Sequence, residues 1–137
     1  MLLLFRASRD GWTPRDFHRL CNDQGATIIF MKTTKEKVCG GFTTIPWGDL
    51  GGYKPVVEGQ DHCCLFSVDS QTLYPVKDLQ NAVWHQKDYG PWFGMKGNLG
   101  INYAKQMNAP NNGFSNIGRS FDIPSDSKGN SVLTGED

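Results

Sequence analysis

The sequence has no excess of charge of either sign. Its 137 residues carry 14 Lys and Arg against 14 Asp and Glu, so the formal net charge is zero. Nucleic-acid-binding domains and proteins that bind broadly to anionic membranes usually carry a basic patch or stripe. The balanced charge therefore argues against nucleic acid and against an anionic lipid surface as the partner.

Long hydrophobic runs are also missing. The apolar start Met1–Phe5 is far shorter than a signal-peptide core or the roughly twenty residues of a membrane span, and no later run approaches that length. We expect no direct membrane insertion and a soluble, cytoplasmic protein, unless a longer precursor carries a signal. Internal repeats and linkers are absent, and 38% hydrophobic content suits one core, so residues 1–137 are predicted to form a single domain.

Cysteines are few and lack the spacing of a metal site. Cys63 and Cys64 are adjacent, whereas zinc ligands usually come in pairs separated by two to four residues. We therefore expect no metal and no cofactor, with Cys21, Cys39 and Cys63 as core residues. A redox-active thiol stays open as an alternative, although no neighbouring residue argues for a lowered pKa.

Convincing catalytic motifs are missing as well. The glycines spaced by three over residues 94–100 lack both the GxGxxG order and the lysine of a phosphate-binding loop. Ser8, Asp10 and His18 lie close in sequence, but Ser8 does not follow the nucleophile-elbow pattern, and turn or cap roles explain the group better. The adjacent pair His62-Cys63 would point to opposite faces of a strand. We predict that the protein is not an enzyme.

The N-terminal stretch carries the most specific local signals. The apolar run Leu2–Phe5 suggests a buried strand, and Asp10-Gly11 suggests a turn in which glycine accepts a positive φ. Thr13 is placed as an N-cap, Pro14 suits the first helical position, and Asp16 stands where a capping-box acid belongs. The helix that follows should bury one face, formed by Phe17, Leu20 and Cys21.

The remaining sequence is mostly β in character. Segments rich in β-branched and aromatic residues alternate with Gly, Pro, Asn and Lys clusters. The first two form a predicted hairpin around a turn at Lys35–Lys37, and Gly40 and Gly41 indicate a bulge or the close approach of another backbone. The expected strands are Thr27–Thr34, Val38–Ile45, His62–Val68, Thr72–Val76, Ala82–His85 and Asn98–Tyr103, with an apolar return at Phe121 and Ile123. The expected loops and turns are Gly48–Gly59, Gly90–Gly97 and Asn108–Ser115.

This pattern predicts a mainly β (α+β) fold in which two antiparallel sheets pack face to face as a β-sandwich. A short N-terminal helix and minor helical turns would lie at the edges. Aromatic side chains should supply much of the core, each large buried ring contributing on the order of 2 kcal/mol. The candidates are Phe17, Phe30, Phe42, Trp47, Phe66, Trp84 and Phe93.

The ordered pieces of this sequence resemble the TLDc domain, the module of the oxidation-resistance proteins. The resemblance covers most of the chain and begins with Leu4–Cys21. Further pieces follow in the family's order at Gly25, Thr27–Lys32, Gly40-Gly41-Phe42, Trp47, Leu65-Phe66-Ser67 and Gly90-Pro91-Trp92-Phe93-Gly94. The resemblance implies the same β-sandwich fold.

Two departures limit the comparison. The sequence ends at Ser131–Asp137, where the family's closing strand should begin, and the family's N-terminal segment is missing, so we expect a domain that is incomplete at one or both ends. After Gly90–Gly94 the family often has a Gly-rich stretch and an Asp, whereas this chain has Met95-Lys96-Gly97-Asn98. A carboxylate role at that point is therefore not carried over.

The resemblance implies a noncatalytic protein-interaction module linked to oxidative-stress resistance. It also implies binding to the peripheral catalytic sector of the vacuolar proton ATPase (V-ATPase) and regulation of that enzyme, at a membrane-bound complex. Cysteine-based antioxidant activity, or a structural and regulatory role in a larger multidomain assembly, is the alternative. Loops that join rigid strands and carry aromatic and charged residues suit recognition. The candidate contacts are Ser8, Arg9, Asp10, Trp12, Pro91, Trp92, Lys96 and Asn98.

Overall fold

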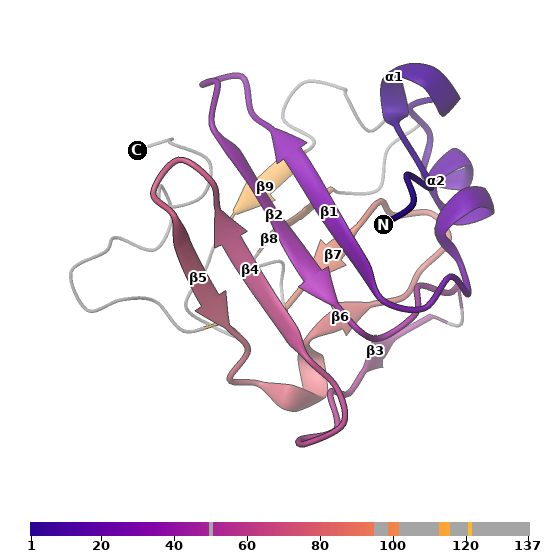
Figure 1. The fold of residues 1–137 in the computed structure, drawn as a ribbon. Helices are drawn as coiled ribbons and strands as arrows, with labels where there is room; N and C mark the ends of the chain where they lie inside the picture. Colours follow the sequence, from indigo (N-terminus) through magenta and orange to yellow (C-terminus); the bar gives the residue numbers. More distant parts are fainter. Residues whose placement is uncertain (50, 95–98, 102–112, 116–120, 122–137) are drawn as a thin grey trace.

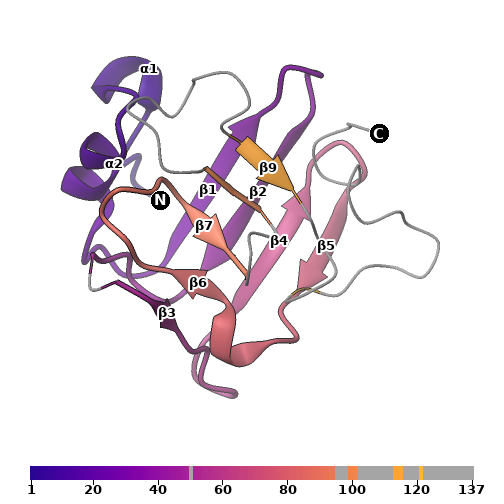
Figure 2. The same cartoon turned by 180° about the vertical axis from the view of Figure 1, so that it is seen from behind.

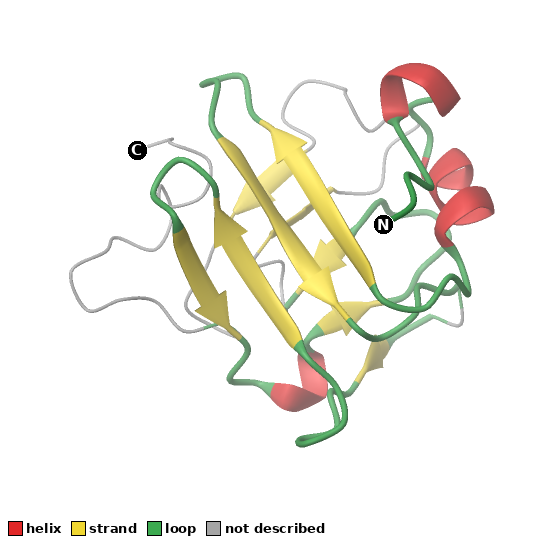
Figure 3. Ribbon diagram, viewed as in Figure 1, coloured by secondary structure: helices red, strands yellow, loops and turns green. Residues whose placement is uncertain are grey.

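Two antiparallel sheets packed face to face form the body of the molecule (Figures 1 and 3). The structure is a computed structural model, and it describes residues 1–49, 51–94, 99–101, 113–115 and 121. The two N-terminal α-helices lie together at one edge of the sandwich, and a short 3₁₀ turn lies apart from them (Figure 3). The predicted mainly β two-sheet fold is confirmed.

The first sheet contains four strands in the order β1-β2-β4-β5. The β1–β2 hairpin pairs Phe30 with Gly40, and its turn includes Glu36 at φ 61°. Across the next two strand pairs, Gly40 lies opposite Phe66, and Phe66 lies opposite Leu73. The strands are β1 (Thr27–Lys32), β2 (Val38–Thr43), β4 (Cys63–Ser67) and β5 (Thr72–Pro75). Four predicted strands thus form one continuous sheet.

The second sheet contains five short strands in the order β3-β6-β7-β8-β9 (Figure 2). They are β3 (Tyr53–Lys54), β6 (Val83–Trp84), β7 (Trp92–Phe93), β8 (Leu99–Ile101) and β9 (Gly113–Ser115). Strands β6 and β8 lie within the predicted Ala82–His85 and Asn98–Tyr103. By contrast, β3, β7 and β9 lie in segments predicted to be loops or turns.

The core lies between the two sheets and is centred on Trp47, which is 1% exposed. Its ring makes edge contacts with Phe17 and Phe93 at centroid distances of 5.4 and 5.5 Å. Its Nε1–H donates to Thr27 Oγ1 at 2.8 Å, so the one polar group of this buried ring is satisfied. Trp47 thereby joins the first sheet, the second sheet and the N-terminal helices.

The predicted aromatic core is only partly confirmed. Phe17, Trp47 and Phe93 are buried in the core cluster. Phe66 is 8% exposed but lies outside that cluster, and Phe30 is 58% exposed, which corrects the assignment of both to the core. Phe30 alternates with Ile29 on β1, and Ile29 faces the core, so Phe30 lies on the outer face. The half-buried Phe42 and Trp84 also lie outside the core cluster, which instead contains Tyr74 and Phe121.

The predicted close approach of another backbone is confirmed at Gly40, whereas a side-chain ring takes that place at Gly41. A Cβ on Gly40 would lie 1.8 Å from the carbonyl oxygen of Ile29, and one on Gly41 would lie 2.4 Å from the ring of Phe93. Strand β2 lies between β1 and β4 in the first sheet, and it has room for hydrogen only at Gly40, beside the β1 backbone, and at Gly41, beneath the Phe93 ring of the second sheet. Both glycines are required by space rather than by a positive φ.

The two α-helices close one edge of the sandwich. α1 (Ala7–Asp10) precedes α2 (Pro14–Cys21), and a 3₁₀ turn, η1 (Leu79–Asn81), precedes β6. Phe17 and Cys21 of α2 are buried and Leu20 is half-buried, as predicted, and His18 joins them in the interior.

The expected strand at Leu2–Phe5 is wrong. These residues have no regular secondary structure, and Leu2 and Leu3 are 79% and 53% exposed. Only Leu4 and Phe5 pack on the core, with the Phe5 ring 5.7 Å from Phe17. The apolar run therefore packs against α2 through its last two side chains instead of pairing with a strand.

Candidate interaction surface

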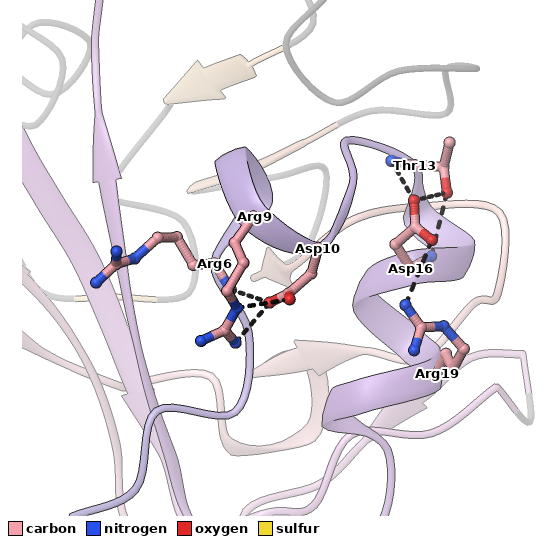
Figure 4. Close-up of polar contacts among 6 residues, drawn as sticks. All are labelled: Arg6, Arg9, Asp10, Thr13, Asp16 and Arg19. Carbon is pink, nitrogen blue, oxygen red and sulfur yellow. Dashed lines mark hydrogen bonds and ion pairs between the residues drawn. The ribbon is translucent and has the colours of Figure 1, made fainter.

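The first predicted contact region folds as an N-terminal helical unit, defined here as α1, the turn after it, and α2. Asp10 organises α1 because its carboxylate turns back to the helix start, where Arg6 N–H donates to Oδ2 at 2.7 Å. Arg9 donates to the same carboxylate through Nε at 2.6 Å and Nη2 at 2.8 Å (Figure 4). The hydrogen bonds from the Arg9 side chain, the larger effect, and from the Arg6 backbone lower the pKa of Asp10 to about 2. Asp10 is therefore ionised at neutral pH and holds both the helix and Arg9 in place.

The predicted capping box of α2 is confirmed. Asp16 N–H donates to Thr13 Oγ1 at 3.1 Å, and Thr13 N–H donates to Asp16 Oδ2 at 3.3 Å. The Thr13 hydroxyl also donates to Asp16 Oδ2 at 2.6 Å, and the Thr13 bonds lower the pKa of Asp16. A Cβ on Gly11 would lie 2.2 Å from that oxygen, and Gly11 has φ 116°. Glycine is required at this turn on both grounds.

Replacing Thr13 with alanine should lower the free energy of unfolding by about 1–2 kcal/mol, because the helix loses its N-cap acceptor. Thr34→Ala is the matched control, since Thr34 is exposed in the β1–β2 turn. Urea denaturation of both variants measures the difference. A Thr13→Ala loss no larger than that of the control would contradict this account of the cap.

Exposed positive charge gathers on the helical unit. Arg9 is held by Asp10, and Arg19 lies 3.7 Å from Asp16. In Figure 4 the guanidinium of Arg6 points away from Asp10. Arg6 and Arg15 are exposed, and within the described part of the chain neither forms an ion pair. Trp12, 39% exposed, lies in the turn between the helices. This surface suits a partner with carboxylate side chains.

The second predicted contact region contributes to an aromatic cluster, defined here as Tyr53, Trp84, Tyr89 and Trp92. The rings meet edge to face in that order, with centroid distances of 4.8, 6.5 and 5.3 Å. All four side chains are half-buried. Tyr53 Oη–H and Trp92 Nε1–H both donate to the carbonyl of Gly94, at 3.2 and 3.0 Å. The hydrogen bonds and ring contacts therefore hold the cluster rigidly on the second sheet.

His18 connects the two regions. It projects from α2, is 7% exposed, and lies with Nε2 2.9 Å from the carbonyl oxygen of Tyr89 and Nδ1 2.8 Å from Asn22 Oδ1. The chain between β6 and β7 runs beside α2 in both views (Figures 1 and 2). His18 is thus committed to Tyr89 and Asn22 rather than to Ser8 or Asp10. The helical unit and the aromatic cluster are neighbouring parts of one side of the molecule.

The predicted site residues differ in accessibility. Ser8, Arg9 and Trp12 are exposed, Asp10 and Trp92 are half-buried, and Pro91 is buried and has little surface to offer a partner. Lys96 and Asn98 lie outside the described residues. Sequence reasoning missed Tyr53, Trp84 and Tyr89, because only the pairing of β3 with β6 and the turn before β7 bring them beside Trp92. Their shared aromatic character was the available signal.

The four cysteine thiols are held in their neutral form. Burial raises the pKa of Cys21 and Cys39 to about 11 and of Cys63 to about 12, and it raises that of Cys64. The thiolate is the reactive species, so these surroundings disfavour attack on peroxide. Cys21, Cys39 and Cys63 are buried as predicted, and Cys64 is half-buried on the opposite face of β4 from Cys63.

Neither a metal cluster nor a membrane helix is found in the described part of the chain. No three His, Cys, Asp or Glu side chains converge there in a way that could hold a metal ion. None of the helices described combines the length and the apolar character that crossing a bilayer requires.

The two-sheet sandwich closed by a capped helical unit defines a β-rich domain whose most distinctive surface is arginine-rich and aromatic. A family model described as the TLDc domain matches residues 1–136. The chain belongs to the TLDc domain family. Comparison with curated proteins and with solved structures gave no match.

Proposed function

We propose that this TLDc domain is a noncatalytic protein-interaction module. Its contact surface combines the N-terminal helical unit with the aromatic cluster. The observation that carries the proposal is the His18–Tyr89 hydrogen bond, which sets exposed arginines and Trp12 beside a rigid group of half-buried rings. Aromatic and arginine side chains are the residues enriched in binding hot spots.

The surface is organised before binding. The Asp10 carboxylate orients Arg9, the Gly94 carbonyl orients Trp92 and Tyr53, and the capping box anchors the start of α2. Side chains that are already ordered lose less conformational entropy when a complex forms. This arrangement supports recognition of a folded acidic partner.

The resemblance to oxidation-resistance proteins supports a particular partner. On this proposal the domain acts in the cytoplasm, binds the peripheral catalytic sector of the V-ATPase at the membrane-bound complex, alters its ATP hydrolysis, and thereby contributes to oxidative-stress resistance. The arginines would pair with carboxylates of that sector, and the aromatic cluster would supply apolar contact area.

Substitution of the surface tests this proposal. Arg9→Ala and Trp92→Ala should each weaken co-sedimentation with the catalytic sector by at least about tenfold, because each removes an oriented anchor. Lys35→Ala and Phe30→Ala are the matched controls, since they remove an exposed cation and an exposed ring from the first sheet. Far-UV circular dichroism verifies that every variant is folded.

Equal binding by all four variants would place the contact elsewhere on the domain. A folded wild-type domain that does not bind the catalytic sector at all would refute the V-ATPase assignment. In that case the same variants can be tested against other assemblies, which separates the choice of partner from the choice of surface.

A further inference from the structure

The first sheet is apolar on its outer, solvent-facing side as well as on the side that faces the core. Alternation along the strands places Cys39, Leu65 and Tyr74 in the core and their neighbours outside. An antiparallel sheet with one face in water normally shows polar residues on that face. The outward set, called the apolar face here, contains Ile28, Phe30, Phe42, Cys64, Phe66, Val68 and Leu73.

The apolar face is contiguous. Strand register sets Phe30, Gly40, Phe66 and Leu73 in one row across the four strands, with Ile28, Phe42 and Cys64 in the next. Because Gly40 has no side chain, the rings of Phe30 and Phe66 meet over it at 5.2 Å. The exposed fractions reach 42% for Ile28, 48% for Val68, 58% for Phe30 and 67% for Leu73. None of the described elements lies over this face (Figure 1).

The two ends of the apolar face carry opposite excesses of charge. The end at the β1–β2 and β4–β5 turns carries Lys32, Lys35 and Lys37 with Glu36 and Asp69. The opposite end carries Asp23, Glu58, Asp61 and Asp78 with Lys77. Turning one copy end over end onto another would therefore set a basic end against an acidic end. A twofold axis that lies in the plane of the contact and perpendicular to the strands produces this arrangement, with the Phe30–Phe66 row near the middle.

We propose that the apolar face binds a second copy of this chain, forming a symmetric dimer through stacked sheets. The area of the apolar face indicates how strong this dimer can be. Four strands about 4.8 Å apart and about five residues long cover roughly 300 Å² in projection. That is less than the roughly 800 Å² per partner of a standard interface, so the dimer should be weak and dissociate on dilution. The apolar face lies on the sheet opposite the aromatic cluster, so the dimer leaves that cluster free.

Sedimentation velocity over about 1 µM to about 1 mM tests the dimer, because this range covers dissociation constants typical of weak association. The wild-type mass should rise from monomer toward dimer. Leu73→Ser and Phe30→Ser should each weaken association at least about tenfold. Val57→Ser should behave as wild type, since Val57 is 47% exposed but lies in the loop before β4.

Three results would overturn the proposal. The first is a wild-type chain that stays monomeric throughout the range, which would leave the apolar face to a different kind of occupant. The second is a dimer that Leu73→Ser does not weaken but Phe30→Ser does, which would indicate pairing at the edge of β1 instead. The third is a dimer that Val57→Ser weakens as much as Leu73→Ser does. Binding of the Leu73→Ser variant to the V-ATPase catalytic sector is measured separately, so the dimer and the proposed function are tested independently.

Discussion

Gly40→Ala should lower the free energy of unfolding by more than about 3 kcal/mol, beyond the usual cost of overpacking. The added methyl would lie 1.8 Å from the Ile29 carbonyl oxygen and 2.7 Å from the Phe66 ring. The ring could turn aside, but the oxygen belongs to β1 and cannot move without opening the β1–β2 ladder. Since single domains are stable by about 5–15 kcal/mol, this one methyl removes a large share of the stability.

Gly48→Ala is the matched control for that substitution. A Cβ at Gly48 would come no closer than 3.6 Å to another side chain, the His85 ring. Chemical denaturation of the two variants at neutral pH should show a small effect for Gly48→Ala and a large one for Gly40→Ala. Similar denaturation midpoints for the two variants would contradict the close approach of Gly40 to the Ile29 carbonyl oxygen.

Acidification from pH 7 to pH 4 should destabilise the domain through His85. Its ring is 1% exposed and 5.9 Å from Trp47, and within the described part of the chain neither ring nitrogen has a hydrogen-bond partner. Burial, followed by the positive charges of Lys54 and His18, lowers the pKa of His85 from 6.5 to about 4. Between about pH 6.5 and pH 4, His85 therefore stays mostly neutral in the folded protein, whereas it binds a proton in the unfolded chain.

The free energy of unfolding depends on pH because the folded and unfolded states bind different numbers of protons at His85. Above about pH 6.5 His85 is neutral in both states, and its contribution to stability is fully present. Between pH 6.5 and 4 the unfolded state binds more protons, so the free energy of unfolding falls with falling pH, by about 2 kcal/mol at pH 5 and about 3 kcal/mol at pH 4.

His85→Phe should remove this part of the pH dependence while leaving most of the stability near pH 7, because a flat aromatic ring, somewhat larger than imidazole, still fills the site and no unpaired nitrogens are buried. Urea denaturation of both proteins at pH 7, 6 and 5 gives the comparison. This window lies above the titration of Asp10, whose pKa is about 2. Parallel curves for the two proteins would show that His85 takes up protons freely in the folded state.

Local signals in the sequence were sufficient where a few neighbouring residues decide the structure. The capping box from Thr13 to Asp16 depends only on contacts within one turn, and it formed as predicted. The β1–β2 hairpin was also predictable, because its strands are six residues long and its turn is polar. Gly40 correctly indicated the close approach of another backbone, whereas Gly41 is approached by the Phe93 side chain.

Tertiary contacts decided the elements that sequence reasoning missed. The strands β3 and β7 have two residues each, too few for periodicity to appear. Leu2–Phe5 has strand-like composition but pairs with no strand, and Phe30 is as apolar as a core residue but faces outward. In both cases the hydrophobicity of the residues does not reveal whether their side chains face the core or the solvent.

The candidate surface was predicted in part for the same reason. Arg9, Trp12 and Trp92 stand in segments whose sequence signals are local, and Arg9 and Trp12 are exposed while Trp92 is half-buried. Tyr53, Trp84 and Tyr89 are brought to Trp92 only when the second sheet forms. The burial of Pro91 likewise depends on packing.

Co-sedimentation of the folded domain with the V-ATPase catalytic sector, with ATP hydrolysis measured on the same samples, tests the proposed function most directly. The account predicts that the wild-type domain binds and alters hydrolysis, that Arg9→Ala and Trp92→Ala lose both effects, and that Lys35→Ala and Phe30→Ala retain them. A folded wild-type domain that neither binds nor alters hydrolysis would contradict it.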